Sequence, residues 1–158
     1  MVQIVSQHNR DVYFMKLALL EAYQAFCERE VPIGAVLVSG EQVLSCGHNK
    51  CEQDNDATSH AEVQVIKQGA SLLRTWRLED TTLYVTKEPC IMCAGAMINA
   101  RVSRVVFGCR DMKGGAVESL YELVSDNRLN HQISVTSGVC EHECAQVLKD
   151  FFALLRKK

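Results

Sequence analysis

Two short motifs that lie far apart in the chain constrain its fold more than any other feature of the sequence. One is His60-Ala61-Glu62, and the other runs from Pro89 through Cys90 to Cys93. Cysteines three residues apart at the start of a helix point their sulfurs to one face, where the positive end of the helix dipole favours thiolates. Thiolate sulfur and imidazole nitrogen are ligands that zinc takes in proteins. If His60, Cys90 and Cys93 bind one zinc ion, the fold must bring the two motifs together.

The number of ligands indicates what kind of metal site this is. Structural zinc sites usually have four protein ligands, whereas three leave one position open for water. We therefore expect a catalytic metal with Glu62 beside the open position, where its carboxylate takes a proton from water and passes it to a substrate. Residues two apart on an ideal helix point to roughly opposite sides, so His60 and Glu62 meet one metal only at a helix N-terminus. We expect Ser59 to be the N-cap of that helix.

Each motif taken alone has a less specific interpretation. Ser59 and Glu62 have the spacing of a capping box, in which the glutamate bonds back to the serine N–H. A lone pair of cysteines at 90 and 93 is also typical of a redox site, or of half a four-cysteine structural site, and a lone histidine is more often a core residue. Together, in this order, the motifs match H-x-E…P-C-x-x-C, the established signature of zinc-dependent nucleobase deaminases. The combination favours the catalytic metal site.

The composition is that of a single folded domain spanning residues 1–158. The chain is 47% hydrophobic, which is enough for its own core at this length. The N-terminus lacks a basic segment followed by an apolar run, and no apolar stretch approaches the roughly 18 residues needed to cross a bilayer. We therefore expect a cytoplasmic protein with no membrane contact, whose eight cysteines are reduced rather than paired.

The charge gives no general support to nucleic-acid binding. The net charge is −2 at pH 7 and the pI is near 6.2, whereas phosphate contacts need positive charge at the binding surface. A polyanionic substrate would therefore require a local basic patch. The candidates for such a patch are Arg101, Arg104, Arg110, Lys113 and residues 156–158.

The spacing of apolar residues predicts helices that alternate with strands. Between Val12 and Phe26 the apolar residues recur at steps of three and four, which is typical of a helix with one buried face. The same reasoning predicts helices over 12–26, 59–73, from 89 onward and over 141–155, and strands over 33–39, 42–46, 81–86, 102–108 and 133–136. This order predicts an α/β fold with three layers, α/β/α, around a central mixed sheet of about five strands.

Most of the sequence resembles the bacterial tRNA adenosine deaminases. The matching segments are EREVPIGAVLV (28–38), GHNK (47–50), SHAEV (59–63), the run of residues 82–116, LNH (129–131) and ECAQVLKDFF (143–152). The part most specific to this tRNA-editing branch is RVVFGCRDMKGGA (104–116). The resemblance implies a cytidine-deaminase-like fold and conversion of adenosine to inosine at the wobble position of a tRNA anticodon, such as the ACG anticodon of an arginine tRNA. It also implies a homodimer with tRNA spanning both subunits.

The same resemblance implies which residues bind the substrate. Asn49 matches an asparagine that holds the flipped nucleoside, and Ile33 matches an apolar wall of the base pocket. Asp111 falls where the family contacts a neighbouring anticodon nucleotide. The sequence departs from the family pattern at Ala57, where relatives often have proline, so a less rigid approach to His60 is expected.

Two other functions share parts of this pattern. A deaminase of free bases or nucleosides, such as guanine, cytosine or cytidine, has the same metal ligands and differs only in its pocket and outer surface. A non-catalytic zinc module that binds RNA is the second alternative. Glu62 argues against the second, because a structural metal site needs no acid beside it.

Overall fold

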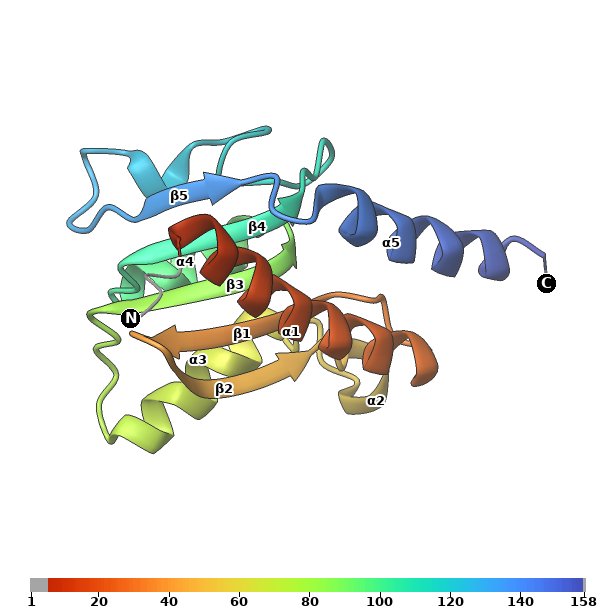
Figure 1. Ribbon diagram of the computed structural model, residues 1–158, viewed down its shortest axis with the longest axis horizontal. Helices are drawn as coiled ribbons and strands as arrows, with labels where there is room; N and C mark the ends of the chain where they lie inside the picture. The colour runs from red at the N-terminus through yellow and green to blue at the C-terminus, as the bar shows by residue number, and fades with distance from the viewer. Residues whose placement is uncertain (1–5, 158) are drawn as a thin grey trace.

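Five strands form one sheet at the centre of the fold; the computed structural model describes residues 6–157 of the chain (Figure 1). The strands are β1 (Gly34–Ser39), β2 (Gln42–His48), β3 (Thr81–Lys87), β4 (Arg104–Cys109) and β5 (Ser134–Ser137). Their order across the sheet is β2-β1-β3-β4-β5. β1 runs antiparallel to β2 and β3, whereas β3, β4 and β5 are parallel to one another. The predicted mixed sheet of five strands is confirmed.

Helices cover both faces of this sheet. The core on one face includes residues of α1 (Gln7–Cys27) and α5 (Glu141–Leu155), and the core on the other includes residues of α3 (Ala61–Leu73) and α4 (Ile91–Asn99). In β1, Val36 and Val38 belong to the first core, and Ala35 and Leu37 belong to the second. Successive side chains of a strand point to opposite faces, so a strand covered on both sides is apolar throughout. The predicted three-layer α/β/α fold is confirmed.

The ends of several elements differ from the prediction. α1 begins at Gln7 rather than Val12, because the Ser6 hydroxyl accepts a hydrogen bond from the Asn9 N–H at 3.2 Å and caps the helix. The apolar repeat alone gave no indication of this polar first turn. A one-turn helix, α2 (Cys51–Asp54), and a 3-10 turn, η1 (Leu123–Ser125), were not predicted. Within residues 6–157, none of the helices is both long enough and apolar enough to span a membrane.

The directions of the strands bring four distant segments to one edge of the sheet. Lys87 pairs with Cys109 at the carboxyl ends of the parallel strands β3 and β4. Because β1 is antiparallel to β3, its first residue, Gly34, lies at the same edge and pairs with His48 at the end of β2. Ligands of α/β proteins usually bind beyond the carboxyl ends of the parallel strands. The residues that immediately flank these strand ends include Ile33, Asn49, Cys90 and Asp111.

Candidate active site

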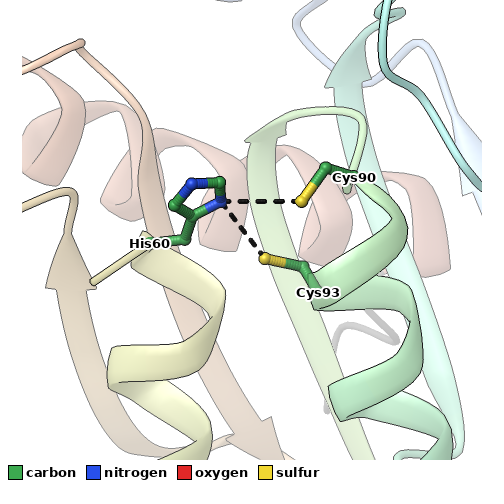
Figure 2. A group of neighbouring side chains, drawn as sticks. All are labelled: His60, Cys90 and Cys93. Atoms are coloured by element: carbon green, nitrogen blue, oxygen red, sulfur yellow. Dashed lines mark hydrogen bonds between the residues drawn. The ribbon is translucent and has the colours of Figure 1, made fainter. Parts of the chain in front are cut away.

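Three potential metal ligands converge between the starts of α3 and α4. Figure 2 shows the His60 ring facing both cysteines, with its Nδ1 atom 3.6 Å from the Cys90 sulfur and 3.5 Å from the Cys93 sulfur. The three ligand atoms all lie within 4.8 Å of one another. Cys93 is buried, whereas His60 and Cys90 are half-buried. The structure therefore places together the three residues that the sequence motifs singled out.

The spacing of these atoms fits a zinc ion. Tetrahedral zinc, with Zn–S near 2.3 Å and Zn–N near 2.0–2.1 Å, sets its sulfur and nitrogen ligands about 3.5 Å apart. The two separations of 3.5 and 3.6 Å agree with that value. Two sulfurs and one imidazole are also a donor set that favours zinc. Among the described residues 6–157, no fourth histidine, cysteine or acidic residue joins the group, so the protein ligands leave one tetrahedral position free.

Both ligand segments adopt the same local structure, in which the ligand is the residue just before a helix. His60 is the N-cap of α3 and Cys90 is the N-cap of α4, and both have extended backbone conformations. The free N–H groups of a helix start carry partial positive charge. Two helix N-termini therefore face the same point, and they stabilise thiolates there. Sequence spacing had placed Pro89 as the first helical residue, but α4 begins at Ile91 and the Pro89 carbonyl accepts a hydrogen bond from Ala116 N–H at 2.9 Å.

The prediction that Ser59 caps α3 is wrong. The Ser59 hydroxyl donates to Asp54 at 2.8 Å instead of capping the helix. The cap comes from Asn49, whose Oδ1 accepts the Ala61 N–H at 2.9 Å. A residue at the end of β2 thus satisfies a helix N–H group that the serine was expected to satisfy. Without Ser59 as the cap, Ser59 and Glu62 do not form a capping box.

Electrostatics at the three ligands already favour metal binding. Hydrogen bonds from Cys93 and from the His60 ring hold the pKa of Cys90 at about 4, well below that of an ordinary thiol. The same hydrogen bond raises the pKa of Cys93, and burial adds to this. The pKa of His60 is raised by its hydrogen bond to Cys90, although burial opposes the rise. These surroundings therefore favour the thiolate form of Cys90, which is the form that binds a metal ion.

Glu62 lies in the first turn of α3 and is almost completely buried. Its exposed fraction is 4%, and burial raises the pKa of its carboxyl group. A hydrogen bond with Cys93 and the nearby His60 ring oppose that rise. The carboxyl group is therefore next to the three candidate metal ligands, in surroundings that make it a weaker acid than usual. A carboxyl group in such surroundings is suited to take up a proton and to release it again.

Asn49 and Ile33 are joined by a backbone hydrogen bond beside this site. The Asn49 N–H donates to the Ile33 carbonyl at 3.1 Å. Asn49 is 5% exposed, and its side-chain oxygen is used to cap α3. We find no hydrogen bond to its NH2 group within the described part of the chain, so this group is available to a ligand. Ile33 is half-buried and packs against the core beneath α3 and α4.

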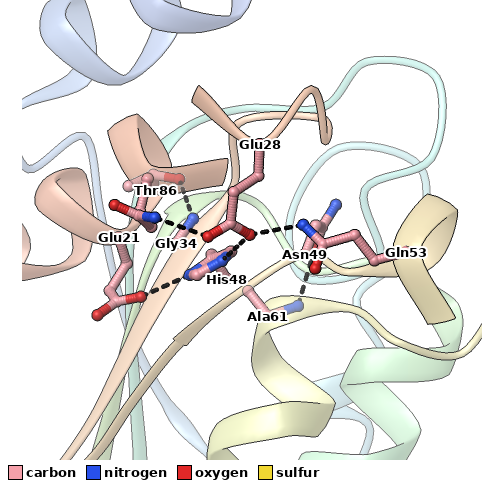
Figure 3. A network of polar contacts seen from close by, with 9 residues as sticks. Glu21, Glu28, Gly34, His48, Asn49, Gln53, Ala61 and Thr86 are labelled. Atoms are coloured by element: carbon pink, nitrogen blue, oxygen red, sulfur yellow. Dashed lines mark hydrogen bonds and ion pairs between the residues drawn. The ribbon is translucent and has the colours of Figure 1, made fainter. Parts of the chain in front are cut away.

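A polar network that the sequence did not reveal supports the turn that carries Asn49. Figure 3 shows His48 between two glutamates, with its Nδ1 2.7 Å from Glu21 and its Nε2 2.9 Å from Glu28. Gln53 of α2 also donates to Glu28, at 2.7 Å. The network connects α1 to β2 and α2 immediately beside the site. No local sequence pattern predicts this network, because His48 and the two glutamates lie on segments distant in the chain.

Asp111 follows β4 and points toward β3 rather than into solvent. Its carboxylate forms an ion pair with Lys87 at 2.8 Å, and its side chain is 17% exposed. Burial opposes ionisation, but the hydrogen bond from Lys87, the backbone N–H groups of the following turn and the Lys87 charge together outweigh it and lower the pKa of Asp111. Neither Lys87 nor the neighbouring acid Glu88 was a candidate from the sequence. The only signal for Glu88 was its position directly before Pro89.

The basic residues proposed as a patch do not all remain free. Arg104 makes two hydrogen bonds of 2.8 Å to the buried Asp11 and so has a structural role. Arg110 pairs with Glu118 at 2.8 Å. Lys113 instead lines a surface groove of about 670 Å³ that Asp111 also lines. The other lining residues are Lys87, Gly114, Leu148, Lys149, Phe152 and Arg156.

The turn before His60 compensates for the absence of proline at Ala57. Asp56 accepts hydrogen bonds from both the N–H and the hydroxyl of Thr58, at 2.8 and 2.7 Å. Such an Asx turn restricts the backbone through side-chain hydrogen bonds. These two hydrogen bonds therefore offset the greater backbone flexibility that was expected before His60.

Comparison of sequences identifies deaminases as relatives. The family described as MafB19-like deaminase matches residues 8–156. A tRNA-specific adenosine deaminase of Bacillus subtilis is 49% identical over 150 residues, which cover 95% of this chain and 93% of the relative. One of Streptococcus pyogenes serotype M1 is 42% identical over 150 residues, with 95% and 88% covered.

Comparison of structures agrees with this result. A solved chain from structural studies of A-to-I editing by tRNA:A34 deaminases has a TM-score of 0.83 and 46% identity, covering 86% of this chain and 99% of its own. A guanine deaminase from Nitrosomonas europaea has a TM-score of 0.74 at 19% identity, covering 95% and 86%. At that low identity the second likeness shows a shared fold alone.

Proposed function

Because the chain belongs to the tRNA-specific adenosine deaminases, we propose that it binds one zinc ion through His60, Cys90 and Cys93 and moves protons with Glu62. The enzyme hydrolytically deaminates adenosine to inosine at the wobble position of a tRNA anticodon. The observation that carries the proposed site is the convergence of three ligands and one buried carboxyl group at two helix N-termini. Each of these residues has a separate chemical task.

The metal has one task in this scheme. When bound, zinc acts as a Lewis acid that lowers the pKa of water to roughly 7 and so supplies a nucleophile at neutral pH. The geometry of His60, Cys90 and Cys93 supports this assignment, since three protein ligands leave one position for water.

Glu62 carries both protons of the water molecule that is consumed. It first accepts one proton and delivers it to N1 of adenine while the water oxygen bonds to C6. It then transfers the second proton to the amino group at C6, which leaves as ammonia, and a C6 carbonyl remains. Burial supports this role because it raises the pKa of the carboxyl group and thus helps it to hold a proton between the two transfers.

Three residues are proposed to bind the nucleotide. Asn49 presents its free NH2 group to the flipped nucleoside, and Ile33 forms an apolar wall of the base pocket. Asp111 contacts a neighbouring nucleotide of the anticodon. Their positions at one edge of the sheet, beside the metal ligands, support these roles.

The groove around Asp111 suits an RNA backbone. It carries four basic side chains and one exposed aromatic residue, although the chain as a whole has a net charge of −2. Basic side chains bind phosphates, and aromatic side chains stack on unpaired bases. An anticodon loop presents unpaired bases that leave their stack at low cost. The substrate we propose is an arginine tRNA with an ACG anticodon, encountered in the cytoplasm.

A direct assay separates this function from deamination of free bases. Purified zinc-loaded protein is incubated with arginine tRNA bearing ACG, and separately with free adenosine, cytidine and guanine, and inosine and ammonia are measured. We expect inosine at the wobble position of the tRNA and no product from the free compounds. Product from a free base alone would assign the enzyme to the other substrate class, and no product at all would make it a non-catalytic zinc protein.

We further propose that the enzyme is a homodimer with tRNA spanning both subunits. Two copies would pool the basic grooves of both chains into one binding surface, which offsets the slightly acidic charge of each. Light scattering after gel filtration is expected to give twice the 17.7 kDa mass of one chain. A single-chain mass at the concentration of the tRNA assay would contradict the dimer.

A further inference from the structure

A buried carboxylate, Glu88, lies between β3 and the start of α4 and is surrounded by hydrogen-bond donors from a single loop. Its exposed fraction is 2%. The loop comprises residues 110–119, which follow β4. Because Glu88 is two residues before Cys90, its side chain connects the loop to the segment that carries this candidate metal ligand.

Both oxygens of Glu88 are fully used by the loop. Oε1 accepts the N–H groups of Val117, Glu118 and Ser119 at 3.2, 2.8 and 2.9 Å. Oε2 accepts the Asp111 N–H at 3.0 Å and the Ser119 hydroxyl. A buried carboxylate requires such donors, and N–H groups that lose it are left unpaired. The interaction therefore holds both ends of the loop.

The loop is built to let this carboxylate approach closely. A side-chain carbon at Gly115 would lie 2.4 Å from the Glu88 carboxyl carbon, so only glycine fits there. The backbone of Gly115 also bridges to Cys90, and the Ala116 N–H donates to Pro89. The loop is thus packed directly on the chain that carries the metal ligands.

The position of Asp111 depends on the same segment. The Asp111 N–H donates a hydrogen bond to Glu88, and the Asp111 carboxylate forms an ion pair with Lys87 at 2.8 Å. Asp111 and Lys113 are also the residues by which the loop lines the basic groove, together with Gly114. Lys87, the last residue of β3, and Glu88, which follows it, therefore determine where the loop places Asp111 and Lys113 for contact with RNA.

We propose that Glu88 is a positioning residue that fixes the loop of residues 110–119, and through it Asp111, for RNA binding. This inference rests on the proposed function, in which Asp111 contacts the tRNA. Glu88 touches neither substrate nor metal in this scheme. Its loss should consequently weaken tRNA binding while metal content and the chemical step persist.

The test is Glu88→Gln in the zinc-loaded protein, with KM and kcat measured on the tRNA. Glutamine keeps the size of the side chain but turns an NH2 group toward N–H donors, so the loop loses its fixed position. We expect KM to rise about tenfold with kcat within about threefold of the parent, which is the pattern of lost substrate binding. Zinc content should stay at one ion per chain. Glu122→Gln, an exposed acid beyond the loop, is the matched control and should change neither constant.

A double-mutant cycle with Asp111→Ala identifies the route of the effect. If Glu88 acts through Asp111, Asp111→Ala alone raises KM, and adding Glu88→Gln raises it little further. Equal effects of Glu88→Gln in both backgrounds would overturn the inference, as would an unchanged KM or a loss of zinc. An absence of inosine with the parent protein is a different result, because it rejects the proposed function before any variant is made.

A milder variant covers the case in which Glu88→Gln does not fold. Ser119→Ala removes one donor to the carboxylate and leaves Glu88 itself in place. We expect a smaller rise in KM of the same kind, with kcat and zinc content unchanged. Ser125→Ala, an exposed serine of η1, is its control. Identical KM values for the two serine variants would contradict the role of Glu88.

Discussion

Glu62→Gln is expected to abolish deamination while the protein stays folded and keeps its zinc. Proton transfer by a positioned side chain typically contributes about 100- to 10,000-fold to a rate. Because both proton transfers are assigned to this one carboxyl group, we expect kcat to fall by at least about 1,000-fold. Single-turnover measurement of wobble inosine, with zinc determined by elemental analysis, checks both parts.

The burial of Glu62 makes the stability control informative. Its exposed fraction is 4%, and burial raises the pKa of its carboxyl group, so the charged form is disfavoured in the folded protein. Replacing it with the neutral, equally large glutamine should therefore not lower the melting temperature of the protein. Glu122→Gln serves as the activity control because this glutamate is exposed and distant in sequence from both motifs. Substantial turnover by Glu62→Gln would refute the proton-transfer role.

Cys90→Ala is expected to remove the metal, and activity with it. Cys90 is one of the two proposed sulfur ligands, and hydrogen bonds from Cys93 and His60 hold its pKa at about 4, which favours its thiolate form. Without it, only one sulfur and one imidazole remain to hold a zinc ion. We expect zinc content to fall from one ion per chain to about a tenth or less after dialysis, because metal affinity depends on the full set of deprotonated ligands.

The chain provides a matched control for this loss. Cys46 is an exposed free cysteine on β2, outside the metal group, so Cys46→Ala should keep both zinc and activity. His60→Ala should behave as Cys90→Ala does, since its Nδ1 lies 3.6 Å from that sulfur. Unchanged zinc content in either ligand variant would contradict the assignment of the metal site.

Local patterns were sufficient to predict the layers of the fold. The apolar repeat between Val12 and Phe26 predicted α1, and the run of residues 33–39 predicted the strand that the structure shows as β1. These patterns depend on periods of 3.6 and 2 residues, which neighbouring positions of the sequence contain. The start of α1 was missed because the cap at Ser6 lies outside the apolar repeat.

The strand order could not be predicted from the sequence, and the site depends on it. The sheet order β2-β1-β3-β4-β5 brings Ile33, Asn49, Cys90 and Asp111 to one edge. Pairing between strands distant in the chain is a non-local choice that depends on how all the faces pack. A motif match indicates that residues act together, but it does not indicate which strands and helices bring them together.

The capping of α3 shows how tertiary structure overrides a local motif. Ser59 and Glu62 have the spacing of a capping box, yet Ser59 bonds to Asp54 and Asn49 caps the helix from the end of β2. The helix needs an acceptor for its first N–H groups, and any acceptor within reach can supply it. Only the folded chain decides which one is nearest.

The two motifs by themselves predicted which residues are the candidate metal ligands and the candidate acid, because this chemistry depends on residue type and local spacing. Tertiary structure decided how far apart the ligand atoms lie, which groups shift their pKa values, and that Glu88 ties the loop of residues 110–119 to the segment carrying Cys90. The physical reason is that burial and hydrogen bonding are properties of the packed chain. His60 and Cys90 reach one point only after the sheet has brought two helix N-termini together.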